Sequence, residues 1–173
     1  MTSARADIRL AQRDDAPALA AHLSRDREAF AATEPSRSED YFTAAGQVER
    51  VERYLGEHAA GRMWPGVVVV EDEVVGWATV SDIRRGPFLV GAVGYWVGTT
   101  HQGRGHAREA LGRLLALMRD ELGLHRAEAS TSLDNVASHH VLRSQGFRAY
   151  GTTTSSFLTD GRWRDSLMWE RVL

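Results

Sequence analysis

A chain of 173 residues, of which 43% are hydrophobic and 25% charged, has the length and composition of one globular domain. Its formal net charge of -2 provides no general basic field, so we expect no nucleic-acid partner. The absence of cysteine excludes disulfides, thiolate metal sites and a cysteine nucleophile. No apolar run approaches the roughly 20 residues that span a bilayer, so no membrane partner is expected. The first seven residues lack the apolar centre of a secretory signal, which favours a cytoplasmic protein.

The first third of the chain predicts a strand and two helices. Residues 8–11 alternate as a short strand, and Asp14 is placed to cap the helix that follows. Residues 25–45 are weakly periodic and contain the polar turn Glu34-Pro35-Ser36-Arg37, which indicates a loop that helps to shape a binding site. Helical spacing returns over residues 46–60, in a helix expected to cover one face of a sheet.

The middle of the chain is rich in β-branched residues. Residues 67–70 and 74–80 are valine-rich runs joined by Glu71-Asp72-Glu73, which predicts an antiparallel hairpin. Residues 88–97 provide a third long strand. We therefore expect these three strands to form an antiparallel meander.

A glycine-rich turn then leads into a helix. Its centre reads Gln102-Gly103-Arg104-Gly105-His106-Ala107-Arg108, and residues 107–122 have the spacing of a helix with one buried face. Small residues in the turn allow the backbone to approach a ligand, and the free amides of a helix N-terminus attract anions. The turn is therefore expected to bind a phosphate. It is neither a Walker loop nor a complete Gly-x-Gly-x-x-Gly motif.

The last third predicts a short strand over 126–131, a helix over 135–145 ended by Gly146, and a closing hairpin with 159–163 as its polar loop. The strands on either side of the glycine-rich turn should pair in parallel, whereas consecutive strands before the turn pair antiparallel. We expect a single α/β domain over residues 1–173, with a mixed, mostly antiparallel sheet of about seven strands flanked by helices.

The glycine-rich turn resembles the Gln/Arg-x-x-Gly-x-Gly/Ala motif of the GCN5-related N-acetyltransferases (GNAT family), with Gln102, Gly105 and Ala107 at the defining positions. The segment from Asp134 to Phe147 resembles the family's Asn-x-x-Ser…Gly-Phe signature. Gly94-Tyr95-Trp96 is similar to the RimJ/RimL branch, which acts on N-terminal alanines of ribosomal proteins. The early turn at Glu34 and the closing hairpin resemble the same branch, so the likeness implies the GNAT fold over nearly the whole chain.

The resemblance implies acetyl-CoA as co-substrate and no metal. Backbone groups of Tyr95, Trp96 and Val97 would bind the pantetheine arm, and the amides of the turn would bind the pyrophosphate. Asn135 would hold the pantetheine arm, and Ser138 would protonate or solvate the departing thiolate; alternatively, both only cap their helix. The predicted catalytic residues are Ser138 and Asn135, and the predicted cofactor-binding residues are these two together with Tyr95, Trp96, Val97, Gln102, Gly103, Arg104, Gly105, His106, Ala107 and Arg108.

The general base is not evident from the sequence, because Ala92 stands where several relatives have a glutamate. An α-amine titrates near pH 8 and a lysine near 10.4, so an α-amine needs less help from a base. This favours an α-amino group, or a primary amine of similarly low pKa, over lysine as the acceptor. The candidate replacement bases are Glu34, Asp82, His139 and Asp165, and either Trp96 or Trp163 could line the acceptor site.

Three interpretations of the function follow. The first is N-acetylation of a protein N-terminus, of the ribosomal-protein alanine type. The second is acetylation of a small amine, such as an aminoacyl metabolite, an antibiotic or a polyamine. The third is a non-catalytic CoA-binding module. An edge strand or the closing hairpin could form a homodimer.

Overall fold

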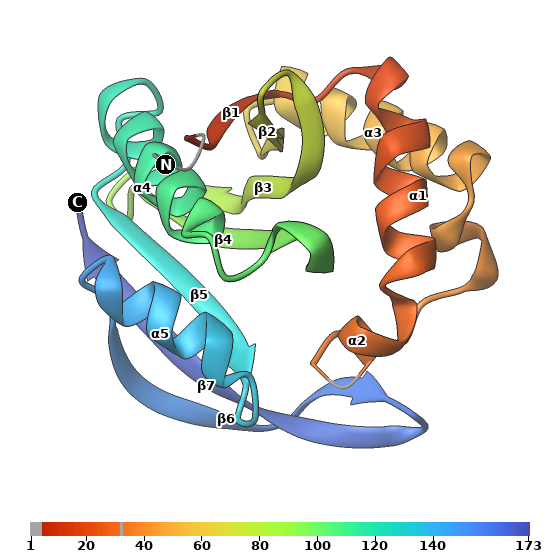
Figure 1. Cartoon of the computed structure of the whole chain (residues 1–173). Helices are drawn as coiled ribbons and strands as arrows, with labels where there is room; N and C mark the ends of the chain where they lie inside the picture. The colour runs from red at the N-terminus through yellow and green to blue at the C-terminus, as the bar shows by residue number, and fades with distance from the viewer. Residues whose placement is uncertain (1–4, 32) are drawn as a thin grey trace.

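The computed structural model describes residues 5–31 and 33–173, and all seven strands belong to one sheet (Figure 1). Met1 to Ala4, which contribute to the expectation about a secretory signal, lie outside the described residues. The strands are β1 (Asp7–Leu10), β2 (Trp64–Val70), β3 (Glu73–Arg84), β4 (Val90–Val97), β5 (Arg126–Ser132), β6 (Arg148–Thr159) and β7 (Arg162–Val172). The helices are α1 (Ala16–Arg25), α2 (Arg27–Ala31), α3 (Ala44–Ala59), α4 (His106–Asp120) and α5 (Val136–Ser144), with 3-10 turns η1 (Arg13–Asp15), η2 (Glu39–Phe42) and η3 (Thr99–His101).

The sheet has the order β1-β2-β3-β4-β5-β7-β6, and only the β4–β5 pair is parallel. The predicted meander, the parallel pair across the glycine-rich turn and the mixed seven-stranded sheet are confirmed. The β4–β5 pairing covers only Val90–Ala92 of β4 and Arg126–Glu128 of β5. Beyond Ala92 the two strands diverge, as Figure 1 shows, so the second half of β4 presents a backbone edge that β5 does not cover.

Helices cover both faces of the sheet and enclose two cores. One core packs α4 and α5 against the sheet through Leu111, Leu114 and Leu142, all fully buried. The other packs α1 and α3 against β3 through Leu19, Val51 and Trp77. Because side chains alternate along a strand, Tyr95 joins the first core and its neighbour Trp96 joins the second. The uncovered end of β4 therefore presents Tyr95 on the face covered by α4 and α5 and Trp96 on the face covered by α1 and α3.

The start of α1 differs from the prediction. Asp14 does not cap the helix, because it lies within η1, and the N-cap position of α1 is Asp15. The Asp15 carboxylate turns back instead: it accepts the Gln12 amide at 2.7 Å and pairs with Arg9 at 2.6 Å. The ion pair with Arg9 thus fixes how the chain leaves β1.

Two connections are also more ordered than the sequence suggested. Residues 25–45 contain the short helix α2 and the turn η2 rather than one irregular loop. The closing hairpin has a two-residue turn, Asp160-Gly161, with φ of 47° and 68°, in place of the longer loop expected over 159–163. Left-handed pairs of this kind match the twist of the flanking strands, which lets β6 and β7 extend further. None of the described helices is long and apolar enough to cross a membrane.

Candidate active site

The glycine-rich turn brings the N-terminus of α4 to the uncovered edge of β4. Gly103 and Gly105 have φ of 72° and 88°, and Gly105 is the N-cap residue of α4. In the part of the chain that the structure describes, no side chain caps this helix, so its first amides and the positive end of its dipole face outward. A Cβ added at either glycine would meet nothing within 4 Å. Gln102 has a structural contact, because its Nε2 donates to the Val97 carbonyl at 2.9 Å and ties the turn to β4.

The space in front of α4 is a cleft, called here the turn cleft, between the end of β4, the turn and the start of α5. His106 is buried in its wall, and its Nδ1 has no hydrogen-bond partner among the described residues. Arg104 is exposed and does not line the cleft. All the other predicted site residues line it: Tyr95, Trp96, Val97, Gln102, Gly103, Gly105, His106, Ala107, Arg108, Asn135 and Ser138.

Asn135 and Ser138 lie together at the start of α5. Asn135 caps the helix, its Oδ1 accepting the Ser138 amide at 3.1 Å, which leaves its NH2 group free of the cap. The Ser138 Oγ lies 2.9 Å from the Tyr95 hydroxyl. Burial raises the pKa of Tyr95 to about 12 despite the hydrogen bond with Ser138, so the phenol keeps its proton at neutral pH. It can therefore donate to Ser138 and leave the serine proton available to a ligand.

The Tyr95 side chain is a feature that sequence reasoning missed, because only the backbone of Tyr95 was expected to take part. The alternation along β4 placed its ring on the α5 side of the sheet. The contact with Ser138 joins residues from β4 and α5, which are far apart in the chain, and no local pattern indicates it.

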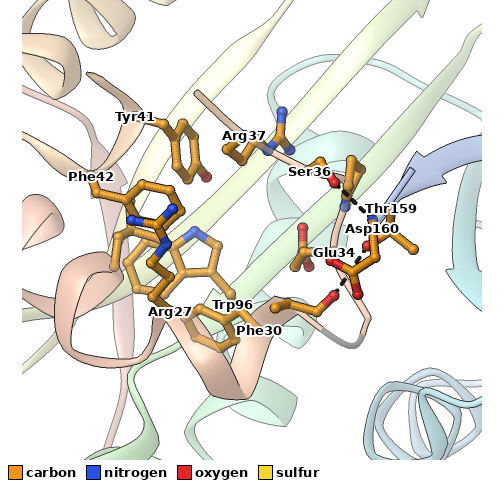
Figure 2. A pocket seen from close by; sticks show the side chains of 13 residues that line it. Arg27, Phe30, Glu34, Ser36, Arg37, Tyr41, Phe42, Trp96, Thr159 and Asp160 are labelled. Atoms are coloured by element: carbon orange, nitrogen blue, oxygen red, sulfur yellow. Dashed lines mark hydrogen bonds between the residues drawn. The ribbon is translucent and has the colours of Figure 1, made fainter. Parts of the chain in front are cut away.

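On the other face of β4, the segment after α2 packs against the tip of the closing hairpin. The Ser36 amide donates to the Leu158 carbonyl at 3.0 Å, the Asp160 amide donates to Ser36 Oγ at 3.0 Å, and Thr159 Oγ1 donates to the Ala31 carbonyl at 3.2 Å. These contacts close one wall of a cavity, called here the aromatic cavity (Figure 2). Its lining includes Arg27, Phe30, Glu34, Arg37, Tyr41, Phe42, Trp96, Thr159 and Asp160.

Glu34 lies where the spaces around β4 meet. It lines the aromatic cavity, the turn cleft and a central cleft that reaches from α3 across β3 and β4 to β5 and α5. Figure 2 shows its carboxylate among the aromatic and polar side chains of the cavity. Among the described residues, no side chain or amide donates to this carboxylate and no cation lies within 4.0 Å of it. Burial raises the pKa of Glu34, and the more distant charges of Arg37 and Arg50 only partly oppose the rise.

The other candidate bases lie outside all three spaces. Asp82 is exposed on β3. His139 is buried, and its Nε2 contacts Thr131 Oγ1 and the Ser132 carbonyl, both at 3.1 Å. Asp165 is exposed and accepts the Ser155 amide at 2.8 Å. Of the two tryptophans considered, Trp96 lines the cavity, whereas Trp163 is 64% exposed on the hairpin.

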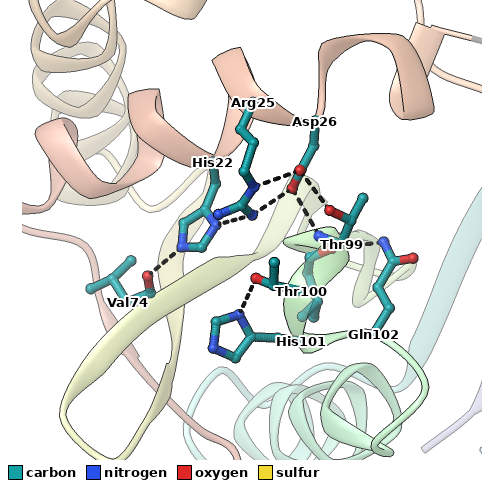
Figure 3. A network of polar contacts seen from close by, with 9 residues as sticks. His22, Arg25, Asp26, Val74, Thr99, Thr100, His101 and Gln102 are labelled. Atoms are coloured by element: carbon teal, nitrogen blue, oxygen red, sulfur yellow. Dashed lines mark hydrogen bonds and ion pairs between the residues drawn. The ribbon is translucent and has the colours of Figure 1, made fainter.

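A buried polar network holds α1 against the start of the turn (Figure 3). Asp26, directly after α1, accepts the Thr99 amide at 2.8 Å and the Thr99 hydroxyl at 2.6 Å, and pairs with Arg25 at 2.8 Å. The His22 ring bridges Arg25 and the Val74 carbonyl. Burial alone would raise the pKa of Asp26, but the hydrogen bonds from Arg25 and Thr99 lower it to about 2. The ionised carboxylate thus fixes η3, from which the glycine-rich turn departs.

Asp26→Asn should lower the free energy of unfolding by about 2 kcal/mol, since it weakens hydrogen bonds to a buried charge. For a chain of this length that is roughly 4–8 °C in Tm. Because the pKa of Asp26 falls from 3.8 to about 2 on folding, its contribution is present above pH 4 and disappears as the pH falls toward 2. Thermal unfolding from pH 2 to 8 measures this, with the exposed Asp120→Asn as control. A Tm deficit that persisted at pH 2 would contradict the assignment.

The geometry thus combines an uncapped helix N-terminus, an uncovered strand edge and a hydroxyl pair around one cleft. A model of the acetyltransferase (GNAT) domain family matches residues 5–148. Because this match spans most of the chain, the chain belongs to the GNAT acetyltransferase family. It is an acetyl-CoA-dependent acetyltransferase, with acetyl-CoA as its co-substrate. The described residues contain no group of three or more histidine, cysteine or acidic side chains that could hold a metal ion.

Relatives in the RimJ/RimL branch resemble the chain over nearly its full length. The ribosomal protein uS5-alanine N-acetyltransferase of Escherichia coli is 29% identical over 170 residues, covering 97% of this chain and 88% of the relative. Mycobacterium smegmatis RimJ in complex with CoA-disulfide has a TM-score of 0.93 and 28% identity, covering 96% of this chain and 81% of that one. The ribosomal-protein-S5-alanine acetyltransferase of Vibrio fischeri has a TM-score of 0.90 and 30% identity, covering 96% and 92%.

Proposed function

We propose that this acetyltransferase modifies the α-amine of a protein N-terminus and that the amine attacks the thioester of acetyl-CoA directly. The position of Glu34 is the observation that carries this proposal, because among the described residues its carboxylate has no hydrogen-bond or ion-pair partner, and it lies at the junction of the aromatic cavity, the central cleft and the turn cleft. The activity of the Escherichia coli relative, alanine N-acetylation of ribosomal protein uS5, supports the same acceptor class. The enzyme is expected in the cytoplasm, and a homodimer stays a prediction.

The donor is proposed to bind along the turn cleft. The first amides of α4, at His106, Ala107 and Arg108, would bind the pyrophosphate, because they are uncapped and lie behind two glycines whose missing side chains leave open space. The uncovered backbone of Tyr95 to Val97 would hydrogen-bond the pantetheine amides as an added strand does. The NH2 group of Asn135, free of the helix cap, would donate to the pantetheine arm.

The residues around the thioester then have distinct roles. The amine nitrogen forms a bond to the acetyl carbon, the carbon–sulfur bond breaks, and the sulfur leaves with its electron pair. Glu34 takes the proton that the amine loses, directly or through one water. Ser138 gives its proton to the sulfur and recovers one from Tyr95 through their 2.9 Å contact. Tyr95 takes a proton back from solvent, and Glu34 releases to solvent the proton that it took from the amine, so the cycle ends with every group in its starting state. A backbone amide at the end of β4 would polarise the carbonyl. No enzyme thioester is needed, in keeping with a chain that has no cysteine.

The absence of a strand-borne glutamate favours an α-amine. Freeing an α-amine at neutral pH costs about 3 kcal/mol less than freeing a lysine, because their pKa values differ by more than two units. A single carboxylate with a raised pKa, such as Glu34, is a moderate base, and a moderate base is enough to deprotonate an α-amine. Ala92 itself lies at the last position of β4 that pairs with β5, outside the three spaces.

Initial acetylation rates on two peptides test the acceptor class. An alanine-led peptide with a free α-amine and no lysine should react at least tenfold faster at pH 7.5 than the same peptide with a blocked N-terminus and one internal lysine, because much more of its amine is neutral. Mass spectrometry should place the acetyl group on the N-terminal nitrogen. Faster acetylation of the lysine peptide would refute the proposal.

A further inference from the structure

A half-buried arginine, Arg50 of α3, lies in the wall of the central cleft. Its guanidinium stacks over the Trp77 ring at 4.6 Å and over the Tyr41 and Tyr54 rings at 5.1 Å each. Its Nη1 donates to Gln47 Oε1 at 3.1 Å, and Gln47 is fully buried. Aromatic faces and a buried amide thus fix the position of this cation before any ligand binds.

Arg50 has no carboxylate partner within 4.0 Å among the described residues. Burial alone would raise the pKa of Tyr54, yet the neighbouring guanidiniums of Arg50 and Arg53, 5.1 and 5.2 Å from its ring, lower it. Arg37 adds a second guanidinium to the same cleft, 4.9 Å from the Tyr41 ring. Against these two cations, the described lining of the cleft has one carboxylate, Glu34. The part of the central cleft around Arg50 and Arg37 is therefore positively charged.

The cleft also contains hydrogen-bond donors that lack acceptors. The indole nitrogens of Trp77 and Trp96, two residues of its lining, are buried and have no hydrogen-bond partner in the described chain. Trp77 is only 2% exposed. Buried donors without acceptors are uncommon in folded proteins and cost free energy unless a ligand or water satisfies them. Together with the two guanidiniums, these indoles add two unsatisfied donors to the lining of the cleft.

We propose that Arg50 and Arg37 bind a carboxylate of the acceptor, so that the preferred acceptor carries an acidic group near the amine that is acetylated. This inference rests on the proposed function and narrows its acceptor. The amine lies at Glu34, and the acidic group lies against Arg50. A polyamine, whose every charge is positive, would meet two cations and one anion in the cleft and would be disfavoured. The carboxylate could belong to an acidic second residue of a peptide or to the C-terminus of a dipeptide.

Pairs of acceptors that differ only in whether they carry the carboxylate test the inference. They also show whether the carboxylate belongs to the second residue or to the C-terminus. The first pair is an alanine-led peptide amide with aspartate or asparagine as its second residue. The second pair is the dipeptide Ala-Ala with a free or an amidated C-terminus. Spermidine is an amine without a carboxylate. With the wild-type chain and acetyl-CoA, we expect kcat/KM to be about tenfold higher for the acid in at least one pair, and that pair identifies the source. This difference should arise mainly from a lower KM for the acidic acceptor.

Arg50→Gln should remove this preference, and Arg50→Lys should keep part of it. Arg53→Gln is the control, because Arg53 is on the same helix but does not line the cleft. Equal rates for acid and amide in both pairs would overturn the inference and leave α-amine acetylation standing; an unchanged preference in Arg50→Gln would also overturn it. If neither pair reacts while a lysine peptide or spermidine does, the proposed function fails as well. The wild-type comparison alone decides the case if Arg50→Gln does not fold.

Discussion

Gly105→Trp is expected to weaken acetyl-CoA binding at least 100-fold. Gly105 has φ of 88°, and a Cβ built there meets open space in front of α4, so the indole would fill the region assigned to the pyrophosphate. It would also shield the free helix amides that attract the anion. Left-handed backbone costs a non-glycine residue about 1–2 kcal/mol in addition. Isothermal titration with acetyl-CoA measures the loss.

Two controls separate bulk from backbone strain. Gly105→Ala has the same strained φ but little bulk, and it should lose about tenfold or less. Gly123→Trp places the same side chain at another left-handed glycine, with φ of 61° and open space, beyond the other end of α4. It should bind acetyl-CoA as the wild type does. If folded Gly105→Trp binds acetyl-CoA with unchanged affinity, the assignment of the pyrophosphate to this turn is wrong.

Glu34→Gln should lower kcat/KM on an α-amine peptide about 100-fold, the lower end of a general base's typical contribution. Its folded pKa is raised, so folding disfavours the charged form. The wild-type carboxylate therefore costs stability at pH values above that folded pKa, and glutamine removes the cost. Activity should fall while the Tm at pH 7 stays equal or rises slightly. The variant should also need a higher pH to reach its maximal rate, because the amine must then lose its proton without the carboxylate.

Asp82→Asn is the matched control for Glu34→Gln. Asp82 is an exposed carboxylate outside the three spaces, and asparagine tolerates its φ of 50°. Its kcat/KM should stay within about twofold of the wild type. A Glu34→Gln variant that kept its activity within threefold would exclude Glu34 as the base. A variant that lost activity together with several degrees of Tm would instead indicate a structural role.

The local sequence predicted backbone conformation well. The valine-rich hairpin, the glycine at each left-handed position of the turn and the Asn135 cap all follow from short-range sterics and hydrogen bonding, which neighbouring residues determine. The assignment of Asp14 as a helix cap failed for a different reason. Arg9, on β1, forms an ion pair with the carboxylate of Asp15, the N-cap residue of α1. This contact between two elements takes the place of the side-chain cap that was expected at the start of the helix.

The sequence by itself therefore determined the fold, the parallel β4–β5 pair and the turn that faces the cleft, because periodicity, turn chemistry and helix termini are local properties. Only the tertiary structure decided which side chains meet there. Glu34 was one of four candidate bases until the packing of the α2 segment on the closing hairpin placed it at the junction of the clefts. Likewise, Arg50 belonged to a helix expected only to cover the sheet. Its contacts with Tyr41 and Trp77 join separate elements, which sequence spacing does not encode, whereas Tyr54 lies four residues further along the same helix.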